Sequence, residues 1–311
     1  MTLSELAHTT VLLEPTVDGC VTRPDGVYVD GTFGRGGHSR LLLSRLAKAG
    51  RLIGFDKDTR AIETGKQLEQ EDKRFTIVQS SFADMKSELA RLGLEKVDGI
   101  LLDLGVSSPQ LDDPERGFSF LRDGPLDMRM NPDAGMTAAD WVAETDEQEM
   151  IRVLKDYGEE RFARRMARAM IEARGKAPIT RTLELAELIK AANPAWEKHK
   201  HPATRAFQAI RIAVNNELGD LETVLDDSVD LLAAGGRLSV ISFHSLEDRM
   251  VKRFIRRQEK GKEIPHGLPV TEDQLGKTMK KIGKAVMPGD EEIRVNPRAR
   301  SAVLRIAERL A

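Results

Sequence analysis

The chain has 311 residues, enough for one large domain or two modest domains with a buried core. Its formal net charge is −2 with 32% charged residues, so any nucleic-acid surface must be a local patch. The single cysteine, Cys20, excludes an internal disulfide and fits a reducing cytosol. The first eight residues have neither a basic start nor a long apolar run, so we expect no signal peptide and no membrane span.

Strand-like and helix-like runs alternate through the first 105 residues. The expected strands are 27–30, 52–56, 75–79 and 97–104, and the first helical run is 39–49. This order predicts an α/β fold, in which a mostly parallel sheet carries helices on both faces. Ligands of such sheets bind at the carboxyl ends of the strands.

A loop with four glycines follows the first expected strand, between Asp30 and His38. Glycine lets backbone N–H groups approach a ligand where a Cβ would collide, and a strand, glycine loop and helix form a nucleotide-type site. Asp56 ends the next strand, 20 residues after Gly36, which is the spacing of an acid that reaches ribose hydroxyls. The alternative is that the glycines form only a turn.

The spelling of this loop favours one class of cofactor. The run Asp30-x-Thr32-x-Gly34-x-Gly36 resembles the acid-x-G-x-G-x-G loop of S-adenosylmethionine (SAM) methyltransferases, with Thr32 in place of the first glycine. A dinucleotide fingerprint would read G-x-G-x-x-G. The candidate cofactor loop therefore comprises Gly34, Gly36, Gly37 and His38, although His38 is also explained as a helix N-cap or a solvated loop residue.

Further candidates lie at later strand ends. Asp103 ends an apolar strand, and an unpaired carboxylate is costly in a core, so we expect it in the crevice where cofactor and acceptor meet. Gln110, in the turn that follows, is placed to hydrogen-bond the cofactor or the substrate. Phe82 follows the third strand, where an aromatic ring packs on adenine or in the core.

Residues from about 110 to 215 contain no convincing strand. A capping box at 145–148 predicts a helix that ends near Gly158, and further helices are expected at 159–174, 182–192 and 202–219. We therefore predict an all-helical insert, 110–215, in a discontinuous domain formed by 1–109 and 216–311.

The α/β pattern then resumes, with a helix at 221–234, a Gly-Gly turn, a strand at 237–243, a helix at 246–257, a long polar loop and a strand at 302–307. We expect His244 and Ser245 to face the crevice. The alternative is a helix-capping cluster with Ser245 as N-cap, which explains Ser245 and Asp248 well and His244 poorly.

Several groups are candidates for contact with RNA. Aromatic and arginine side chains on a loop stack unpaired bases, although they also pin a loop onto a core. Exposed arginines bind phosphates, although most are merely solvated; three basic patches in a chain of net charge −2 favour a phosphate partner. The candidates are Arg116, Phe118, Phe120, Arg161, Arg164, Arg165, Arg168, Arg253, Arg298 and Arg300.

No cysteine and histidine cluster has the spacing of a metal site. His199 and His201 flank Lys200 without a third ligand, which is typical of solvated loop residues. We therefore expect no metal.

Long motifs resemble one family in particular. They are Asp30–Ser39, Leu101–Gln110, Arg116–Phe120, Pro125–Arg129, Tyr157–Glu160, Ile241–Arg249 and Asn296–Ala302. Together they resemble the bacterial small-subunit (16S) rRNA cytosine N(4)-methyltransferase family, RsmH or MraW, in order from His8 to Arg309. Thr32 is how this family spells the glycine loop. Thr10 departs from the proline of many members, at a position that touches none of the candidate chemistry.

The resemblance implies a class I SAM-dependent methyltransferase fold with a helical substrate-recognition insert. It implies methyl transfer to the exocyclic amine of a cytidine in the decoding (P-site) region of 16S rRNA, within the small subunit or a late assembly intermediate. The family is cytoplasmic, and dimers are known in it. The implied SAM contacts are Gly36, Gly37, His38, Asp56, Phe82, Asp103 and Gln110.

The mechanistic hypothesis rests on Asp103 and His244. The lone pair of the cytosine amine is conjugated with the ring, so a hydrogen-bond acceptor such as Asp103 helps to localise it, while His244 is a candidate to hold the unstacked base. SAM is already charged, so no metal is needed. The alternatives are a SAM-binding assembly factor without catalysis, a methyltransferase with another acceptor, and an NAD dehydrogenase, which the loop spelling disfavours.

Overall fold

The computed structural model describes residues 10–195, 201–262 and 275–311. His199, the first eight residues and much of the lysine-rich stretch at 258–283 lie outside the described residues. The chain divides into two compact units: unit 1 comprises Met1–Gly105 and Gly219–Ala311, and unit 2 comprises Val106–Leu218. These bounds lie three or four residues from the expected ones.

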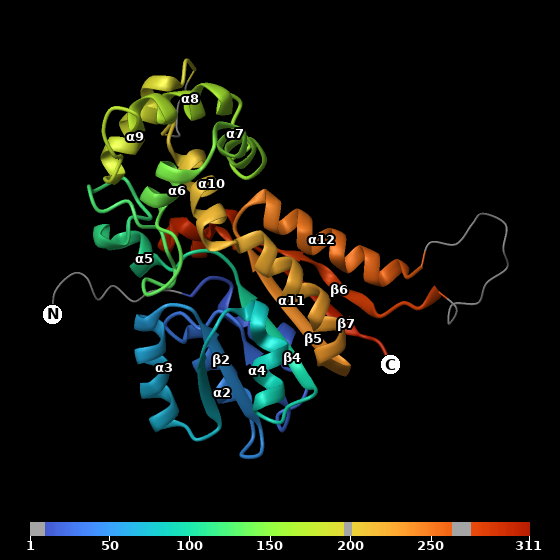
Figure 1. The fold of residues 1–311 in the computed structure, drawn as a ribbon. Helices are drawn as coiled ribbons and strands as arrows, with labels where there is room; N and C mark the ends of the chain where they lie inside the picture. The colour runs from blue at the N-terminus through green and yellow to red at the C-terminus, as the bar shows by residue number, and fades with distance from the viewer. Residues whose placement is uncertain (1–9, 196–200, 263–274) are drawn as a thin grey trace, which may run out of the picture. The chain divides into compact units, whose positions relative to one another are not determined.

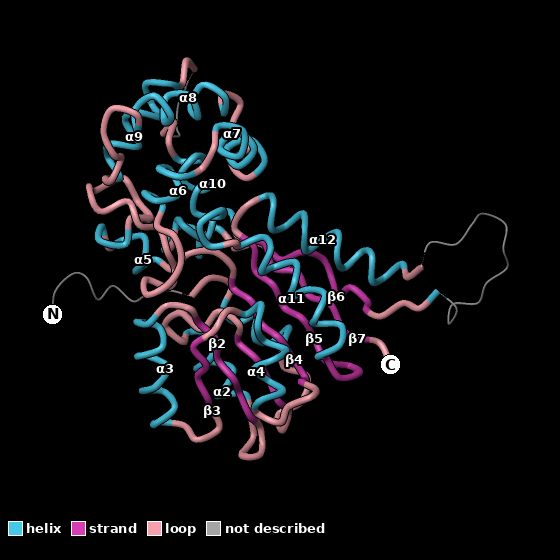
Figure 2. The backbone as a smooth tube through the Cα atoms, viewed as in Figure 1, coloured by secondary structure: helices cyan, strands magenta, loops and turns pink. Residues whose placement is uncertain are grey.

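Unit 1 is built on a seven-stranded sheet of order β3-β2-β1-β4-β5-β7-β6 (Figures 1 and 2). The strands are β1 Val27–Asp30, β2 Arg51–Asp56, β3 Phe75–Gln79, β4 Val97–Asp103, β5 Leu232–Ser242, β6 Met279–Val286 and β7 Val303–Arg309. Strands β1 to β5 pair in parallel, whereas β7 is antiparallel to both β5 and β6. The expected mostly parallel sheet is confirmed.

The parallel register brings three strand ends together. Asp30 at the end of β1 is level with Gly54 of β2 and Leu101 of β4. Because parallel strands point the same way, the loops that follow β1, β2 and β4 leave from one edge of the sheet. This edge carries Asp30, Asp56 and Asp103.

Helices cover both faces of the sheet. Apolar side chains of α1 (Leu13–Cys20), α2 (Gly37–Arg45) and α3 (Thr59–Glu71) form one core with the sheet. Those of α4 (Met85–Arg91), α11 (Glu217–Leu231) and α12 (Ser245–Lys260) form the other. The sheet is therefore shielded on both sides, as parallel sheets require.

Two features of the second half differ from expectation. Strand β5 begins at Leu232, so the expected helix at 221–234 ends three residues early and the Gly-Gly pair lies inside the strand. Strand β6, which we expected to be polar loop, pairs with β7 despite its lysines. Its side chains are mostly exposed, so it has no apolar alternation from which a strand can be predicted.

Unit 2 is helical, as expected. Its helices are α5 Ser108–Asp112, α6 Ala138–Glu144, α7 Glu147–Asp156, α8 Ala163–Arg174, α9 Thr182–Ala192 and α10 Thr204–Asn215. They enclose their own core, which includes Trp141, Met166 and Ile210. In the described chain, no helix combines the length and the apolar character needed to cross a membrane.

Some predicted helix ends in unit 2 are wrong. The N-cap of α7 is Asp146, whose side chain accepts from Glu149 N, so Thr145 instead ends α6. Helix α8 begins at Ala163 because Glu159 has a positive φ of 50° and the next residues form a turn. The expected helix at 202–219 breaks at Asn216, which has a left-handed φ of 52°.

Candidate functional site

The glycine loop between β1 and α2 is organised by Asp30. This carboxylate is buried and accepts hydrogen bonds from Thr32 N (3.1 Å) and from Ser39 Oγ (2.7 Å). Both oxygens therefore hold the loop's own ends, one on each side of the glycines. Burial raises the pKa of Asp30 to about 6, an effect that the Ser39 hydrogen bond partly opposes.

Thr32 links the loop to β4. Its hydroxyl oxygen accepts a hydrogen bond of 2.6 Å from Asp103 N, the last residue of that strand. A glycine at this position has no oxygen to offer. The departure from the generic acid-x-G-x-G-x-G spelling thus fixes the end of β4, and with it the backbone of Asp103, against the loop.

Two glycines make the close approaches in this loop. Gly36, the N-cap of α2, has φ +76°, and a Cβ there would lie 2.8 Å from the Phe33 ring. A Cβ on Gly37 would lie 1.9 Å from Thr10 Oγ1. Thr10 therefore packs directly on the candidate cofactor loop, which corrects our expectation that it touches none of the candidate chemistry.

Asp56, at the end of β2, closes the other side of the loop. It accepts from Gly34 N (2.8 Å) and from Asp58 N (2.8 Å), one bond on each carboxylate oxygen. A carboxylate has about four lone-pair positions, so Asp56 still has acceptor capacity for hydroxyl groups. Burial raises its pKa to about 6, whereas these backbone hydrogen bonds lower it.

Asp103 and His38 face each other with unsatisfied atoms. His38 Nδ1 lies 3.7 Å from Asp103 Oδ2, and both Asp103 Oδ1 and His38 Nε2 are buried without a hydrogen-bond partner among the described residues. Burial lowers the pKa of His38 to about 4, so its imidazole is neutral at pH 7. The pKa of Asp103 is raised well above its ordinary value, first by burial and then by the carboxylates of Asp30 and Glu247.

Orphaned buried polar atoms are costly, so they mark a position where a partner binds. No lysine or arginine of the described ranges forms an ion pair with Asp30, Asp56 or Asp103. This edge of the sheet therefore carries excess negative potential. It suits a ligand that brings hydrogen-bond donors and a positive charge.

His244 caps α12, and this corrects the capping alternative, which had assigned that position to Ser245. Its Nδ1 accepts from Glu247 N at 3.5 Å, and Glu247 accepts in return from Phe243 N and His244 N. Its Nε2 lies 3.1 Å from Glu247 Oε1 but has no hydrogen-bond partner. The capping box thus explains His244, and the proposed contact with the base stays a prediction.

The other two predicted cofactor residues lie in different units. Phe82 begins a short 3-10 helix, Phe82–Asp84, after β3, and its Cβ lies beside Gly31 at the start of the loop. Gln110 lies in unit 2, where its Oε1 accepts from Ser107 N to cap α5. Their contacts with a cofactor stay predictions.

Two of the predicted RNA-contact residues are buried. Arg116 donates to the carbonyls of Arg129 (3.0 Å) and Met130 (2.9 Å), and Phe118 belongs to the unit 2 core. The ring of Phe120 packs on those of His201 and Phe207, with ring centroids 4.6 and 4.7 Å apart, respectively. For Arg116 and Phe118 the structure thus favours the alternative, a loop pinned to the core, because buried groups have no surface to offer a base.

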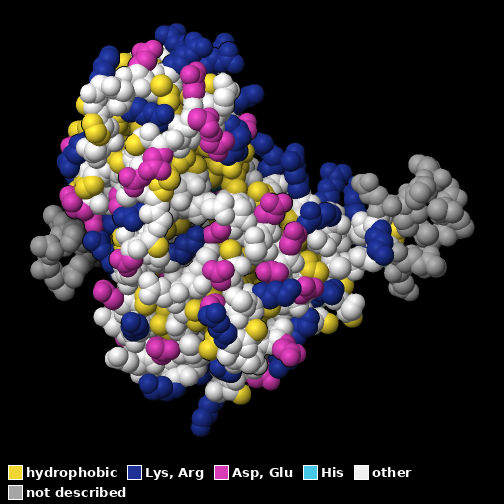
Figure 3. Space-filling model, in the orientation of Figure 1, with side chains coloured by type: hydrophobic (Ala, Val, Ile, Leu, Met, Phe, Trp, Pro, Cys, Tyr) yellow, Lys and Arg dark blue, Asp and Glu magenta, His cyan; other side chains and the backbone are white. Residues whose placement is uncertain are grey.

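The predicted basic residues are exposed, but they are not equivalent. Arg168 of α8 pairs with Glu147 of α7 at 3.2 Å, so its charge is already compensated. Arg164 and Arg165 are exposed and form no ion pair within the described chain. Arg161, Arg253, Arg298 and Arg300 are also exposed, and lysine and arginine side chains gather over α12 on the face in Figure 3.

Sequence reasoning missed three residues that build this site. Thr32 and Ser39 position the loop through their hydroxyls, and buried Glu247 anchors the start of α12 beside Asp103. The sequence did give one signal for Thr32, because it replaces the first glycine of the acid-x-G-x-G-x-G pattern. Ser39 and Glu247 gave only ordinary helix-start signals.

A family model described as the MraW methylase family matches residues 5–310. Among solved structures, the chain is 12% identical to a putative rRNA-methylase from Clostridium thermocellum, covering 97% of each chain with a TM-score of 0.45. It is 10% identical to an rRNA methylase from Streptococcus thermophilus, covering 96% of this chain and 93% of the other, with a TM-score of 0.42. The assignment that follows rests on the family match.

Proposed function

The chain belongs to the MraW methylase family, and from this premise we propose that it methylates the exocyclic N(4) amine of a cytidine in the decoding region of 16S rRNA. The cofactor is S-adenosyl-L-methionine, and the fold is that of class I SAM-dependent methyltransferases with a helical insert. The observation that carries the proposal is at the end of β4. There the Oδ1 atom of Asp103 is buried and has no hydrogen-bond partner among the described residues.

The residues at this edge of the sheet fit the cofactor. Asp56 retains acceptor capacity for ribose hydroxyls, and Gly36 and Gly37 let the loop pack closely on Phe33 and Thr10 beside it. The carboxylates of Asp56 and Asp103 have no cationic partner among the described side chains, which suits a positively charged sulfur. We assign the cofactor contacts to Gly36, Gly37, His38, Asp56, Phe82, Asp103 and Gln110 on this basis and on the family motif.

Bound SAM supplies an electrophilic methyl group on a sulfonium sulfur. We assign Asp103 to the amine: one oxygen accepts an N–H hydrogen bond, so the nitrogen lone pair is freed from the ring and points along the transfer axis. The N–C bond forms as the S–C bond breaks, and one amine proton leaves. The raised pKa of Asp103 makes its carboxylate a better acceptor for that proton than an ordinary aspartate.

His38 helps to orient the Asp103 carboxylate. It is buried and neutral, and its Nδ1 is close enough to Asp103 Oδ2 for a hydrogen bond after a small movement. A neutral imidazole orients the carboxylate without neutralising it. The target base must leave its stack to reach Asp103, which costs a few kcal/mol and is least costly for an unpaired base.

The whole proposal includes the setting of the reaction. The substrate is 16S rRNA within the small subunit or a late assembly intermediate, which places the protein in the cytoplasm. The family match is the support for this setting. A homodimer is compatible with the family and is tested by the mass of the protein in solution.

The test uses 30S subunits that lack N(4)-methylcytidine. They are incubated with the protein and methyl-labelled SAM, and the rRNA is digested to nucleosides for mass spectrometry. We expect labelled N(4)-methylcytidine from one rRNA position. Label on another nucleoside would redirect the acceptor. No label on subunits, intermediates or free rRNA, despite SAM binding, would indicate a non-catalytic assembly factor.

A further inference from the structure

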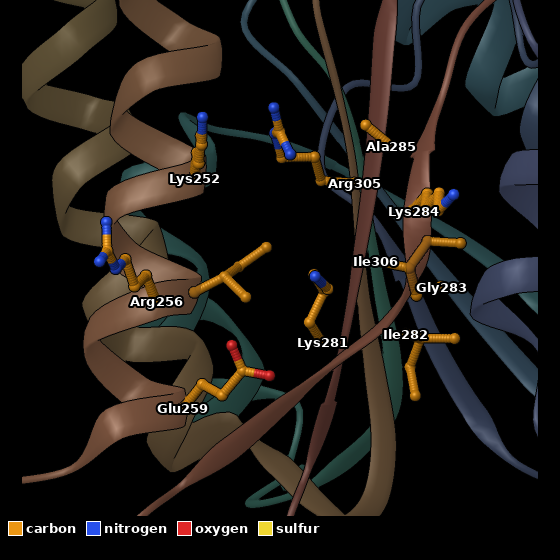
Figure 4. Close-up of a pocket in the computed structure, with 11 residues that line it drawn as sticks. Lys252, Arg256, Glu259, Lys281, Ile282, Gly283, Lys284, Ala285, Arg305 and Ile306 are labelled. Atoms are coloured by element: carbon orange, nitrogen blue, oxygen red, sulfur yellow. The ribbon is translucent and has the colours of Figure 1, made fainter.

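A groove lies between α12 and the antiparallel strands β6 and β7 of unit 1 (Figure 4). Its volume is about 260 Å³, and it contains none of the residues assigned to the cofactor or to the amine. Besides Arg305 of β7, three cationic side chains line it: Lys252 and Arg256 from α12, and Lys281 from β6. Two separate elements therefore direct positive charge into one depression.

The charge in this groove is not neutralised. Glu259 is the one carboxylate among the lining residues, against these three cations. Arg305 is already held by Asp248 through two bonds of 2.7 and 3.0 Å. None of Lys252, Arg256 and Lys281 forms an ion pair with any residue in the described ranges, in a chain whose net charge is −2.

One apolar side chain, that of Ile255 of α12, lies among the cations. Ile282 pairs with Ile306, whose side chain packs against Gly19 of α1 on the other face of the sheet. The groove therefore offers mainly positive charge, which suits the anionic groups of a phosphodiester backbone.

The backbone of β6 helps to shape the groove. Its register with β7 shifts between Ile282 and Val286, and Gly283 in this bulge has φ +65° with no atom within 4 Å of a built Cβ. A bulge redirects side chains and leaves part of the strand unpaired. Lys281 and Ala285, which lie on either side of the bulged Gly283, therefore both line the groove, while the Lys284 side chain points away from α12 (Figure 4).

Protection of an edge strand is the simpler explanation for lysines and a bulge on β6. It accounts for Lys280, whose amine pairs with Glu308 at 2.8 Å. It does not account for Lys252 and Arg256, which come from a helix and have no strand edge to protect. The convergence of cations from both sides is what needs a ligand.

We propose that this groove is a second RNA-binding site, which holds the phosphodiester backbone of the substrate RNA away from the methyl-transfer site. The inference rests on the proposed function for the identity of the RNA. The binding energy gained here is spent on positioning, because the acceptor cytidine must be unstacked and aligned elsewhere in the molecule.

The variant Lys252→Gln/Lys281→Gln tests the groove from both of its walls. The matched control is Lys48→Gln/Lys66→Gln, which removes the same charge from exposed lysines outside the groove. The probe is a fluorescent RNA that contains the acceptor cytidine and its flanks, titrated by anisotropy at several salt concentrations. We expect the groove variant to bind about tenfold more weakly and its salt slope to fall by about 1.4, for two lost phosphate contacts.

Kinetics and protection give independent readouts. In methyl transfer we expect a higher KM for RNA, with kcat at saturating RNA and SAM affinity as in the control variant. In the wild-type protein, bound RNA should protect Lys252 and Lys281 from acetylation, measured by mass spectrometry, which requires no mutant to fold. Unchanged RNA affinity and no protection would overturn the inference.

The outcomes also separate this inference from the proposed function. Groove-dependent RNA binding without methylation of any RNA supports the groove and refutes the assigned reaction. Methylation that is insensitive to the groove refutes the groove alone. A defect seen only with intact subunits, and not with protein-free RNA, would assign the groove to an acidic protein surface and overturn the RNA proposal.

Discussion

The two units treat their carboxylates differently. In unit 2, Asp123 is paired with Arg181 and Glu149 with Arg152, and these arginines hold the pKa of both carboxyls below the ordinary value. At the strand ends of unit 1, Asp56 and Asp103 are partly buried without a cationic partner among the described residues, and desolvation raises the pKa of both. The insert thus satisfies these groups internally, whereas the sheet edge leaves a charge deficit for a ligand to fill.

The difference has a thermodynamic meaning. Paired surface carboxylates add little to stability, about 0–1 kcal/mol each, and they need nothing from outside the protein. A buried, unpaired carboxylate destabilises the empty protein, and the ligand that compensates it recovers that free energy on binding. At Asp103, the empty protein is therefore less stable and the ligand binds more tightly, whereas Asp123 has neither effect.

The largest expected effect follows from Asp103→Asn, which removes the charge while preserving the shape. Turnover should fall at least about 100-fold, because the amide is a weaker acceptor for the amine proton. The empty protein should become more stable, and a gain of about 1 kcal/mol would raise Tm by roughly 2–4 °C. Labelled methyl transfer and thermal unfolding measure the two effects.

Asp123→Asn in unit 2 is the matched control for that experiment. It removes an exposed carboxylate paired with Arg181, so we expect turnover to be unchanged and stability to fall only slightly. If Asp103→Asn left both turnover and SAM affinity unchanged, its assigned role would be wrong.

The next effect concerns the shape of the glycine loop. Gly36→Ala places a Cβ 2.8 Å from the Phe33 ring at φ +76°, and we expect SAM affinity to fall at least about tenfold. Gly93→Ala has a similar φ of +72° with no atom within 4 Å, so it should cost about 1 kcal/mol of stability and leave SAM binding intact. Calorimetric titration with SAM compares the two variants, and equal losses would assign the effect to backbone strain alone.

Acidity should change cofactor affinity because Asp56 has a pKa of about 6. Ribose hydroxyls donate to the ionised form, so binding releases a proton and affinity should rise between pH 5 and pH 7 by up to about tenfold. S-adenosylhomocysteine, which lacks the sulfonium charge, should gain less than SAM because Asp103 also favours a cation. Parallel pH profiles for the two ligands that superimpose would contradict the assignment of Asp103.

The stability of the protein without SAM should change with pH in the opposite direction to its SAM affinity: it should fall as pH rises over this range. The folded-state pKa values of Asp30 and Asp56 lie above the unfolded value, so their contribution is present below about pH 4 and is lost as pH rises through about 6. Denaturant titrations with and without SAM measure this. The Asp123 pair, with its lowered pKa, should instead lose its contribution as pH falls.

The smallest expected effect tests paired against unpaired arginines on α8. Arg164→Ala/Arg165→Ala removes two free charges and should weaken RNA binding roughly fivefold. Arg168→Ala removes a charge that Glu147 already compensates, and we expect a change within about twofold. If all three arginines proved equal, the ion pair would not persist in the complex.

The local sequence pattern predicted the parts of the fold that depend on interactions between neighbouring residues. The four glycines, Asp56 and Asp103 were found because strand periodicity and glycine geometry act within a few residues. Strand β6 was missed because its exposed lysines give no alternation, and its pairing with β7 is tertiary. The cap at His244 was missed because imidazole is an uncommon N-cap, and the burial of Arg116 was missed because it depends on carbonyls 13 and 14 residues away.

The order of the strands has a consequence for synthesis of the chain. Asp103 of β4 pairs with Ile241 of β5, 138 positions later, so the centre of the sheet cannot close until the whole insert has been made. Unit 2 has its own core and is free to fold while β1 to β4 wait with an open edge. Pairings so distant in sequence form slowly, and an unpaired edge attracts other strands in the meantime. Asp103 is thus the last residue of the strand whose second side stays open until β5 has been made, so the candidate site forms only after the insert.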